Sequence, residues 1–327
     1  MRRVGSLAIT RSTALAEPAV TDPTRLSTLD DSRLDDYRDL RERDLSRERG
    51  AFIAEGFEVL KHLVASEVRV RSVLCSEARW ARVAPLVASL PAEVPRIVLP
   101  EALMSAVVGF PVHRGILASG TREDLGRAET LDALPEGPCA LLALQGLSNH
   151  DNVGACFRNA AAFGAHAVVL DAESADPLYR KAIRVSMGHV LRVPFTRRAP
   201  SEFTSALRAR GFATVALTPR RDAAPVDAFL SGARPFPDRF ALLVGAEGAG
   251  LPDASIASAD LAIQLPMAGG TDSLNAATAA AVALHALRYV SPSSFAGTSS
   301  TRSLTMTPDG AGASSGSSDS SAEKNAR

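Results

Sequence analysis

The sequence predicts an α/β protein with two domains and polar tails. Short apolar runs alternate with stretches of helical periodicity over residues 52–118 and again over residues 140–290. Such alternation is typical of sheets flanked by helices. The length of 327 residues also suits two domains with additional tails. We therefore divide the chain into five segments. These are a disordered tail (1–28), a charged helix with the first domain (29–120), a linker (121–138), a second domain (139–291) and another disordered tail (292–327).

The N-terminal 28 residues mix Ser, Thr, Pro and Ala without periodicity, which predicts disorder. From residue 30 to 49 dense alternating charge surrounds a thin apolar stripe at helical spacing, formed by Leu34, Tyr37, Leu40 and Leu45. This pattern predicts a solvated helix with ion pairs along it. An arm that contacts RNA is the alternative.

The first domain is predicted from a βα alternation over some seventy residues. Helices are expected at 57–64, 81–90 and 100–108, and strands at 68–74, 96–99 and 115–118. The next stretch, around residues 119–138, is rich in Pro, Gly and acidic residues, so it has the composition of a linker.

The second domain opens with an apolar run at 140–144 that is short enough for a buried strand. A small-residue helix follows and ends at Gly164, a typical C-cap residue. Further strands are predicted at 167–170, 213–217, 240–244 and 261–265, and helices at 177–187, 201–210 and 274–289. From residue 292 onward the chain is mainly Ser, Gly, Thr and Asp, which cannot form a core.

Polar residues gather where the first strand of this domain meets its helix. Asn149, Asp151 and Asn152 are all good N-cap types, and Arg158 lies on the second helical turn among alanines. A strand–loop–helix junction is where α/β proteins place ligands. Arg158 is therefore either a surface residue or a permanently charged group aimed at an anion.

Two later strand ends carry further polar loops. The stretch 245–250 is glycine-rich and contains Glu247, but it matches neither the dinucleotide fingerprint nor a P-loop. Its glycines suit a backbone that turns sharply past a flat ligand. Glu247 is either a simple loop carboxylate or an acceptor of hydrogen bonds from Arg158 or Asn152. In the last loop Ser273 is expected to N-cap the long alanine-rich helix that follows.

Composition narrows the function classes. Lys plus Arg and Asp plus Glu both number 36, so net charge does not favour a nucleic-acid partner. The few lysines leave mainly arginine, which suits bidentate phosphate contacts, although codon bias would give the same result. The three cysteines lack metal-ligand spacing, which predicts no metal site and reduced thiols in a cytoplasmic protein. No apolar run approaches the roughly 20 residues of a membrane span, and the start lacks a signal-peptide core.

One predicted helix and its surroundings form the densest basic patch of the chain without matching acids. The residues are Arg180, Lys181, Arg184 and Arg192. Because phosphate attraction is long-ranged, this patch is the candidate RNA track; a solvated helix face is the alternative.

The three polar blocks, in this order and each at the end of an apolar strand, resemble the SpoU (TrmH-like) family of RNA ribose 2′-O-methyltransferases. The resemblance covers about residues 48–290. It implies a SPOUT-type parallel sheet whose C-terminal part forms a trefoil knot, preceded by a small L30e-like α/β domain that binds the RNA substrate. It also implies S-adenosylmethionine as methyl donor and a homodimer with its site near the dimer interface.

Residue by residue, the resemblance assigns two groups. The donor contacts would fall on Thr218, Gly245, Leu265, Met267 and Leu274. The catalytic group would be Arg158 with Asn152, Glu247, Ser273 and Asn275. Arginine barely deprotonates in proteins, so we expect Arg158 to bind phosphate, stabilise the developing alkoxide or relay a proton rather than act as a free base.

The expected activity is methyl transfer to a ribose 2′-hydroxyl, of 23S-type rRNA or of a guanosine in the tRNA D-loop. An RNA-binding or ribosome-assembly protein that keeps the fold without catalysis is the rival from another class. A dinucleotide oxidoreductase is disfavoured because its glycine fingerprint is missing.

Overall fold

The computed structural model describes residues 22–38, 40, 49–110, 112, 114–123, 125–199, 202–269, 271 and 273–296. The disorder expected of residues 1–21 and 297–327 lies outside this part, as do residues 39 and 41–48 of the expected charged helix. The described chain begins earlier than predicted, because β1 (Thr24–Arg25) pairs with a strand of the first domain. It also ends later, because η5 (Pro292–Phe295) packs Phe295 against Phe240 with ring centroids 5.9 Å apart.

The first domain is a five-stranded sheet in the order β1-β4-β3-β5-β2. The first three of these strands are parallel, and β5 runs antiparallel to both β3 and β2. Helices α2 and α3 pack on one face of the sheet, and η1 and α4 on the other. The elements are β2 (Ala51–Glu55), α2 (Phe57–Val64), β3 (Val70–Ser76), α3 (Glu77–Val87), β4 (Arg96–Leu99), α4 (Glu101–Val108) and β5 (Ile116–Thr121).

The segment before this domain differs from its prediction. Over its described residues it forms a 3-10 helix, η1 (Ser32–Tyr37), in which Leu34 and Tyr37 are fully buried. The Tyr37 hydroxyl lies 2.8 Å from Ser72 Oγ, and Asp36 pairs with Arg71 at 3.0 Å. The expectation of a solvated helix is therefore wrong for these residues, because packing against the sheet decides their environment.

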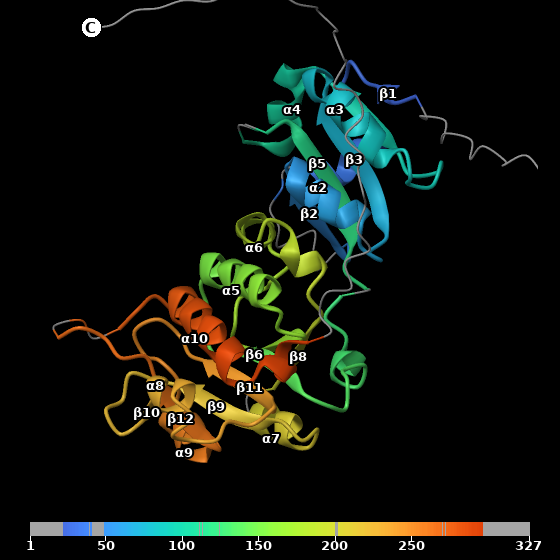
Figure 1. Ribbon diagram of the computed structural model, residues 1–327. Coiled ribbons are helices and arrows are strands. Elements are labelled where there is room, and N and C mark those ends of the chain that lie inside the picture. Colours follow the sequence, from blue (N-terminus) through green and yellow to red (C-terminus); the bar gives the residue numbers. More distant parts are fainter. Residues whose placement is uncertain are drawn as a thin grey trace, which may run out of the picture.

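The second domain is a seven-stranded parallel sheet in the order β10-β12-β9-β11-β6-β7-β8 (Figure 1). The predicted α/β class with a parallel sheet is thus confirmed. Its central strands are buried on both faces, as parallel strands generally are. The strands are β6 (Cys139–Leu144), β7 (Ala167–Asp171), β8 (Phe195–Arg198), β9 (Ala213–Leu217), β10 (Ala224–Pro225), β11 (Arg239–Val244) and β12 (Leu261–Gln264).

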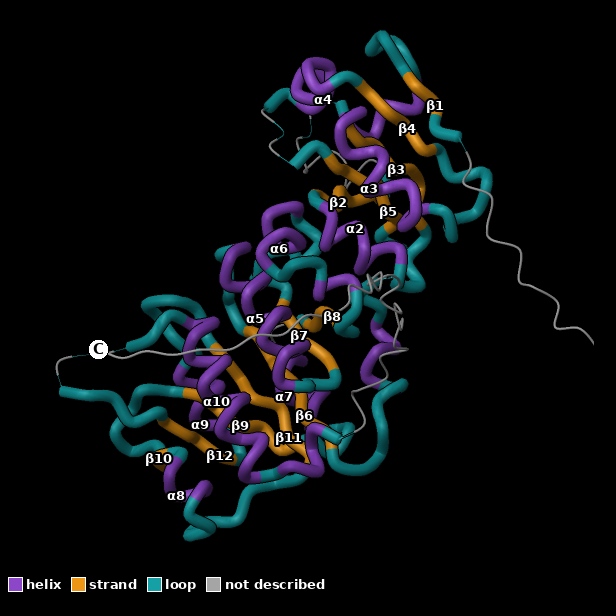
Figure 2. The backbone as a smooth tube through the Cα atoms, turned by 45° about the horizontal axis from the view of Figure 1, so that its top comes forward, coloured by secondary structure: helices purple, strands orange, loops and turns teal. Residues whose placement is uncertain are grey.

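Helices cover both faces of this sheet (Figure 2). Apolar residues of α5, α6 and α10 pack on one face, while α7 and α9 pack on the other. As the small residues predict, α5 and α10 approach closely, and Asn159 Nδ2 donates to the carbonyl of Ala277 at 2.7 Å. The helices are α5 (His150–Phe163), α6 (Arg180–Val185), α7 (Phe203–Arg208), α8 (Asp227–Leu230), α9 (Asp253–Ser258) and α10 (Ala276–Val290).

The expected linker packs against the second domain. It contains η2 (Ala128–Leu131), whose Leu131 is buried, and Arg122 pairs with Asp176. The two domains also touch directly, since α6 lies against β2 and the short η3 (His189–Leu191) lies against α2.

Candidate functional site

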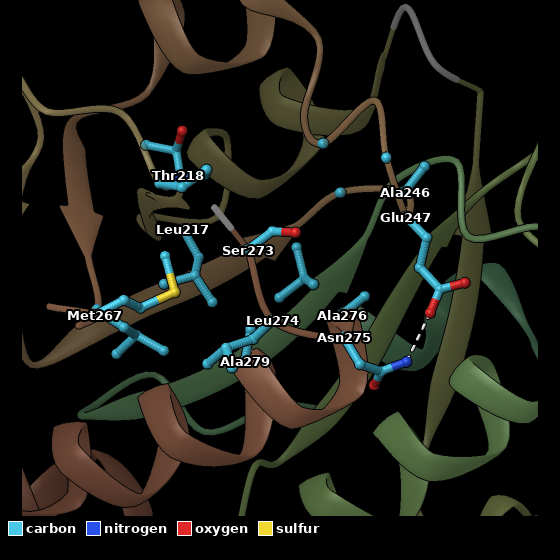
Figure 3. Close-up of a pocket in the computed structure, with 16 residues that line it drawn as sticks. Leu217, Thr218, Ala246, Glu247, Met267, Ser273, Leu274, Asn275, Ala276 and Ala279 are labelled. Atoms are coloured by element: carbon cyan, nitrogen blue, oxygen red, sulfur yellow. Dashed lines mark hydrogen bonds between the residues drawn. The ribbon is translucent and has the colours of Figure 1, made fainter. Parts of the chain in front are cut away.

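A pocket of about 330 Å³ opens at the carboxyl ends of β9, β11 and β12, beside the start of α10 (Figure 3). Parallel strands place their loops at one edge of the sheet, so residues far apart in sequence meet there. The predicted donor-contact residues all line this pocket: Thr218, Gly245, Leu265, Met267 and Leu274. The prediction therefore identified residues that share one cavity.

The walls of the pocket are largely apolar. Leu274 is a large apolar side chain that is nevertheless 41% exposed, and it lies with Leu265 and Met267 around the cavity. A pocket with apolar walls and a few polar groups at its rim is typical of small-molecule sites. Glu247, Ser273 and Asn275 supply polar groups here.

The loop after β11 folds back on itself. Ala246 and Gly250 form an isolated antiparallel bridge, with the amide of Gly250 donating to the carbonyl of Ala246 at 2.9 Å. A Cβ on Gly245 would lie 2.1 Å from the carbonyl carbon of Gly250. Only glycine fits at this position, so close backbone approach explains Gly245, while Gly248 and Gly250 adopt positive φ angles of 80° and 70°.

Asn275 joins the three polar blocks. Its Nδ2 donates to Asn152 Oδ1 at 2.9 Å and to Glu247 Oε1 at 2.6 Å. Its Oδ1 accepts from the amide of Thr278 at 3.1 Å, so Asn275 is the N-cap of α10. The expectation that Ser273 caps this helix is wrong; Ser273 lies two residues earlier and lines the pocket.

These contacts also change the expectation for Glu247. Its carboxylate accepts from Asn275, which in turn reaches Asn152, rather than directly from Arg158 or Asn152. The start of α5 is fixed by Asn149, whose Oδ1 accepts from the amide of Asp151 at 2.8 Å. Asn152, on the first turn, is buried. The three loops thus meet through side-chain hydrogen bonds.

Arg158 lies apart from this cluster. It follows Asn152 by six residues, which is about 9 Å along the helix axis and about 120° around it. Its side chain is exposed and forms no hydrogen bond or ion pair with another described residue. Within one chain, the guanidinium is therefore not brought to the pocket.

The predicted basic patch on α6 has acidic partners. Arg180 Nη1 lies 2.8 Å from Glu55 Oε2, Arg184 Nη1 lies 3.7 Å from the same oxygen, and Lys181 pairs with Asp151 at 2.7 Å. The Arg180 guanidinium also lies over the ring of Phe110. The description of this patch as basic without matching acids is wrong, because Glu55 comes from the other domain. Arg192, in contrast, is exposed.

Some pocket residues were missed by the sequence analysis, namely Leu217, Pro219, Val244 and Ala279. Leu217 and Val244 are the last residues of β9 and β11. Their place at strand ends, next to residues that were chosen, is the signal that could have identified them. Ala279 carries no such signal, because its role depends on how α10 leans over the sheet.

Thiol and metal chemistry is not indicated by the described residues. Burial raises the pKa of Cys156 to about 12, that of Cys75 to about 12 and that of Cys139 to about 11. Thiols with such pKa values are poor nucleophiles. Within the described ranges no group of three or more His, Cys, Asp or Glu side chains is arranged to hold a metal ion. None of the helices described there is long and apolar enough to cross a membrane.

Comparisons with known proteins agree with this geometry. Residues 140–285 match the model of the SpoU rRNA Methylase family. A protein of Mycobacterium bovis, named as an uncharacterized tRNA/rRNA methyltransferase, is 38% identical over 262 residues, covering 78% of this chain and 88% of its own length. A 23S rRNA (guanosine-2′-O-)-methyltransferase RlmB of Burkholderia is 33% identical over 187 residues, covering 55% of this chain and 72% of its own length.

Among solved structures, the AdoMet-bound rRNA methyltransferase from Sinorhizobium meliloti superposes with a TM-score of 0.68. The alignment covers 81% of this chain and 97% of that chain, with 24% sequence identity. This likeness supports the fold over most of the chain.

Proposed function

This chain belongs to the SpoU rRNA methylase family, and on that premise we propose that it transfers a methyl group from S-adenosylmethionine to a ribose 2′-hydroxyl of ribosomal RNA. The observation that carries the proposal is that Asn275, which lines one apolar pocket together with Glu247, donates hydrogen bonds to both Glu247 and Asn152. The RlmB relative, whose name specifies guanosine-2′-O methylation of 23S rRNA, supports the reaction and the substrate class.

The pocket fits the proposed donor. Its volume of about 330 Å³ lies within the range of small-molecule sites, about 300–1,000 Å³. Leu265, Met267 and Leu274 would provide apolar surface for a flat neutral base, and the residues after β9 and β11 that line the same pocket would offer peptide groups to it. The carboxylate of Glu247 places negative charge at the rim, which favours a cationic ligand such as a sulfonium.

S-adenosylmethionine, when bound, supplies a methyl group already activated for in-line displacement. The protein must therefore hold the ribose oxygen in line and stabilise the charge that develops when its proton leaves. Asn275 has both side-chain amide hydrogens and its oxygen engaged, so it holds the rim rigidly. Asn152 and Glu247 then present groups of fixed orientation to the ribose, together with the Ser273 hydroxyl.

In this proposal Arg158 supplies the positive charge of the active site. It acts at the pocket of the partner subunit rather than at the pocket of its own chain. Arg158 is remote from the pocket of its own chain, and α10 beside it exposes Val282 by 45% and Tyr289 by 69%. Exposed apolar side chains on a helix favour a protein contact. A two-fold homodimer through α5 and α10 would bury this surface and place each Arg158 at the partner subunit's pocket. There it stabilises the developing alkoxide.

Two finer features of the fold belong to the same proposal. We expect residues after β9 to form a trefoil knot. The order β10-β12-β9-β11 supports this, because the chain crosses to both sides of β9 before α10 returns to α5. We also assign the first domain as an L30e-like RNA-binding domain, which its mixed sheet and its position ahead of the SpoU region support.

The activity is tested with purified protein, unmodified rRNA and labelled donor. We expect ribose methylation of rRNA, and donor binding measurable by calorimetry without RNA. Absence of donor binding would favour a non-catalytic RNA-binding protein on the same fold. Methylation of unmodified tRNA but not of rRNA would move the substrate to tRNA, which the name of the mycobacterial relative also includes.

The role of Arg158 has its own test. We expect Arg158→Ala to keep donor binding and to lose turnover. Mixed dimers of Arg158→Ala with the pocket variant Asn275→Asp should recover about a quarter of wild-type activity, because half of the dimers are mixed and each has one intact site. No recovery in the mixture, with dimers present, would place Arg158 and the pocket in the same chain's site.

A further inference from the structure

A group of basic and histidine side chains crosses the junction between the two domains. We call it the interdomain strip, and it consists of Lys61, His62, His189, Arg192 and Arg158. Lys61 and His62 lie at the end of α2, His189 and Arg192 in and after η3, and Arg158 on α5. Because η3 packs against both α2 and α5, the strip runs from the first domain to the proposed catalytic arginine.

The middle of the strip is tightly built. The His62 and His189 rings have centroids 4.7 Å apart. A Cβ on Gly188 would lie 3.1 Å from the Cβ of His62 and 3.1 Å from the Cα of Val59, so glycine lets the two domains approach here. Packing therefore holds the end of α2, which carries Lys61, against η3, which Arg192 follows.

The charges of the strip are not neutralised. Lys61, Arg158 and Arg192 are exposed, and none forms an ion pair with another described residue. Burial lowers the pKa of His62 to about 4, and His189, Arg192 and Lys61 contribute to the shift. Burial also lowers the pKa of His189, and the charges of Arg192 and Arg158 lower it further. Both rings are thus neutral near pH 7, with cations around them.

The strip differs in this respect from α6. The cations of α6 are held by Glu55 and Asp151, so a phosphate would have to displace a carboxylate there. Near the strip, Glu58 lies one turn before His62 on α2, is exposed and forms no ion pair with a described residue. Arg192 also lines a hollow of about 560 Å³ between the turn after α2 and β8, which Glu67 lines too.

From this arrangement we propose that the interdomain strip binds the sugar–phosphate backbone of the RNA substrate and leads it to Arg158. Unpaired cations in a row attract successive phosphates, and the partly exposed histidine rings offer stacking surface to an unpaired base. The inference rests on the proposed function for the identity of the nucleic acid. Since Arg158 is assigned to the partner subunit's pocket, one subunit holds the RNA while the other holds the donor.

The test is the salt dependence of RNA binding by the full chain. The probe is a short, unmodified single-stranded RNA of mixed sequence, titrated without methyl donor. In single strands each phosphate contact contributes about 0.7 to the slope of log affinity against log salt. The double variant Lys61→Gln, Arg192→Gln should therefore bind more weakly at low salt, with a slope reduced by about 1.4.

A matched control is Arg25→Gln, Arg234→Gln, which removes the same charge from exposed residues away from the strip. We expect its slope to stay near that of the wild type, and both double variants to keep donor binding. Equal slopes for the strip variant and the wild type, or equal reductions in both double variants, would overturn the proposal. This readout needs no turnover, so the two proposals can fail independently. A protein that did not methylate RNA would refute the proposed function, while the salt slopes alone would decide whether the interdomain strip binds RNA.

Discussion

Replacing Asn275 by Asp separates the two roles of this side chain. An aspartate keeps an oxygen that can cap α10, where Asn275 now accepts from Thr278, and its negative charge suits a helix N-terminus. It loses the hydrogen bonds donated to Asn152 and Glu247. It also places a second carboxylate against that of Glu247, at a position where the present contact is 2.6 Å.

The size of the effect follows from these contacts. A hydrogen bond to a charged group contributes about 1.5–3 kcal/mol, and the exposure of Asn275 and Glu247 favours the lower end. A loss of about 1.4 kcal/mol in the transition state is about tenfold in rate, and displacement of a positioning group by about 1 Å costs up to about 100-fold. We expect Asn275→Asp to lose about 10- to 1,000-fold in kcat, with the cap retained. Asn275→Ala should also lose about 1 kcal/mol of stability.

The assay combines turnover at saturating RNA and donor with thermal unfolding. Because like charges in contact raise the pKa of one of the two carboxyl groups, the activity of Asn275→Asp relative to wild type should rise as the pH is lowered. One protonated carboxyl can then donate to the other. An Asn275→Asp enzyme as fast as wild type at neutral pH would refute the idea that this amide organises the site.

Three further changes test other parts of the structure. Gly245→Ala should abolish donor binding in calorimetry and destabilise the fold by about 1–3 kcal/mol, since its Cβ would overlap Gly250. Glu55→Gln should lower the free energy of unfolding by about 2 kcal/mol, less than the loss of a fully buried pair, because it removes the carboxylate that pairs with the partly exposed Arg180. His62→Gln should reduce the loss of stability in acid. The pKa of His62 is lowered from 6.5 to about 4 in the folded protein, so the unfolded chain takes up this proton at a higher pH. The contribution of the neutral ring to folding stability is therefore full above pH 6.5 and falls as the pH drops towards 4.

Each change has a control. The control for Gly245→Ala is Gly137→Ala, because a Cβ on Gly137 would have no atom within 4 Å. We expect Gly137→Ala to bind the donor like the wild type, and the same result for Gly245→Ala would contradict the steric argument. For Glu55→Gln, unchanged unfolding would show that the ion pair does not hold the domains. For His62→Gln, the melting temperature is measured as a function of pH. A profile identical to that of the wild type would contradict the assignment of part of the acid loss of stability to His62.

Local sequence patterns predicted what depends on near neighbours. The apolar runs at 140–144 and 240–244 became β6 and β11, and Gly164 ends α5 in a left-handed conformation with φ of 80°. The three polar loops could be chosen because they resemble the motifs of the SpoU family, and parallel strands bring their carboxyl ends to one edge. The pairing of those loops through Asn275 could not, since it depends on the exact approach of α10 to α5.

Long-range electrostatics were the least predictable feature. Arg180 looked unpaired in the sequence because its partner, Glu55, lies 125 residues away in the other domain. Tyr37 likewise reads as part of a solvated stripe, yet it is buried against Ser72. Periodicity gives the face of a segment but not what covers that face. The separation of Arg158 from the pocket was also not predictable, because the spacing of residues along a helix does not show where the neighbouring loops lie.

The central proposition is methyl transfer to an RNA ribose at the pocket beside Asn275. It is tested most directly by mapping ribose 2′-O-methylation across rRNA and tRNA in cells with and without the gene, and after return of wild-type or Asn275→Asp protein. We predict one rRNA position that loses its methyl group in the deletion strain and regains it only with the wild-type protein. Identical ribose methylation in all four samples would contradict the account.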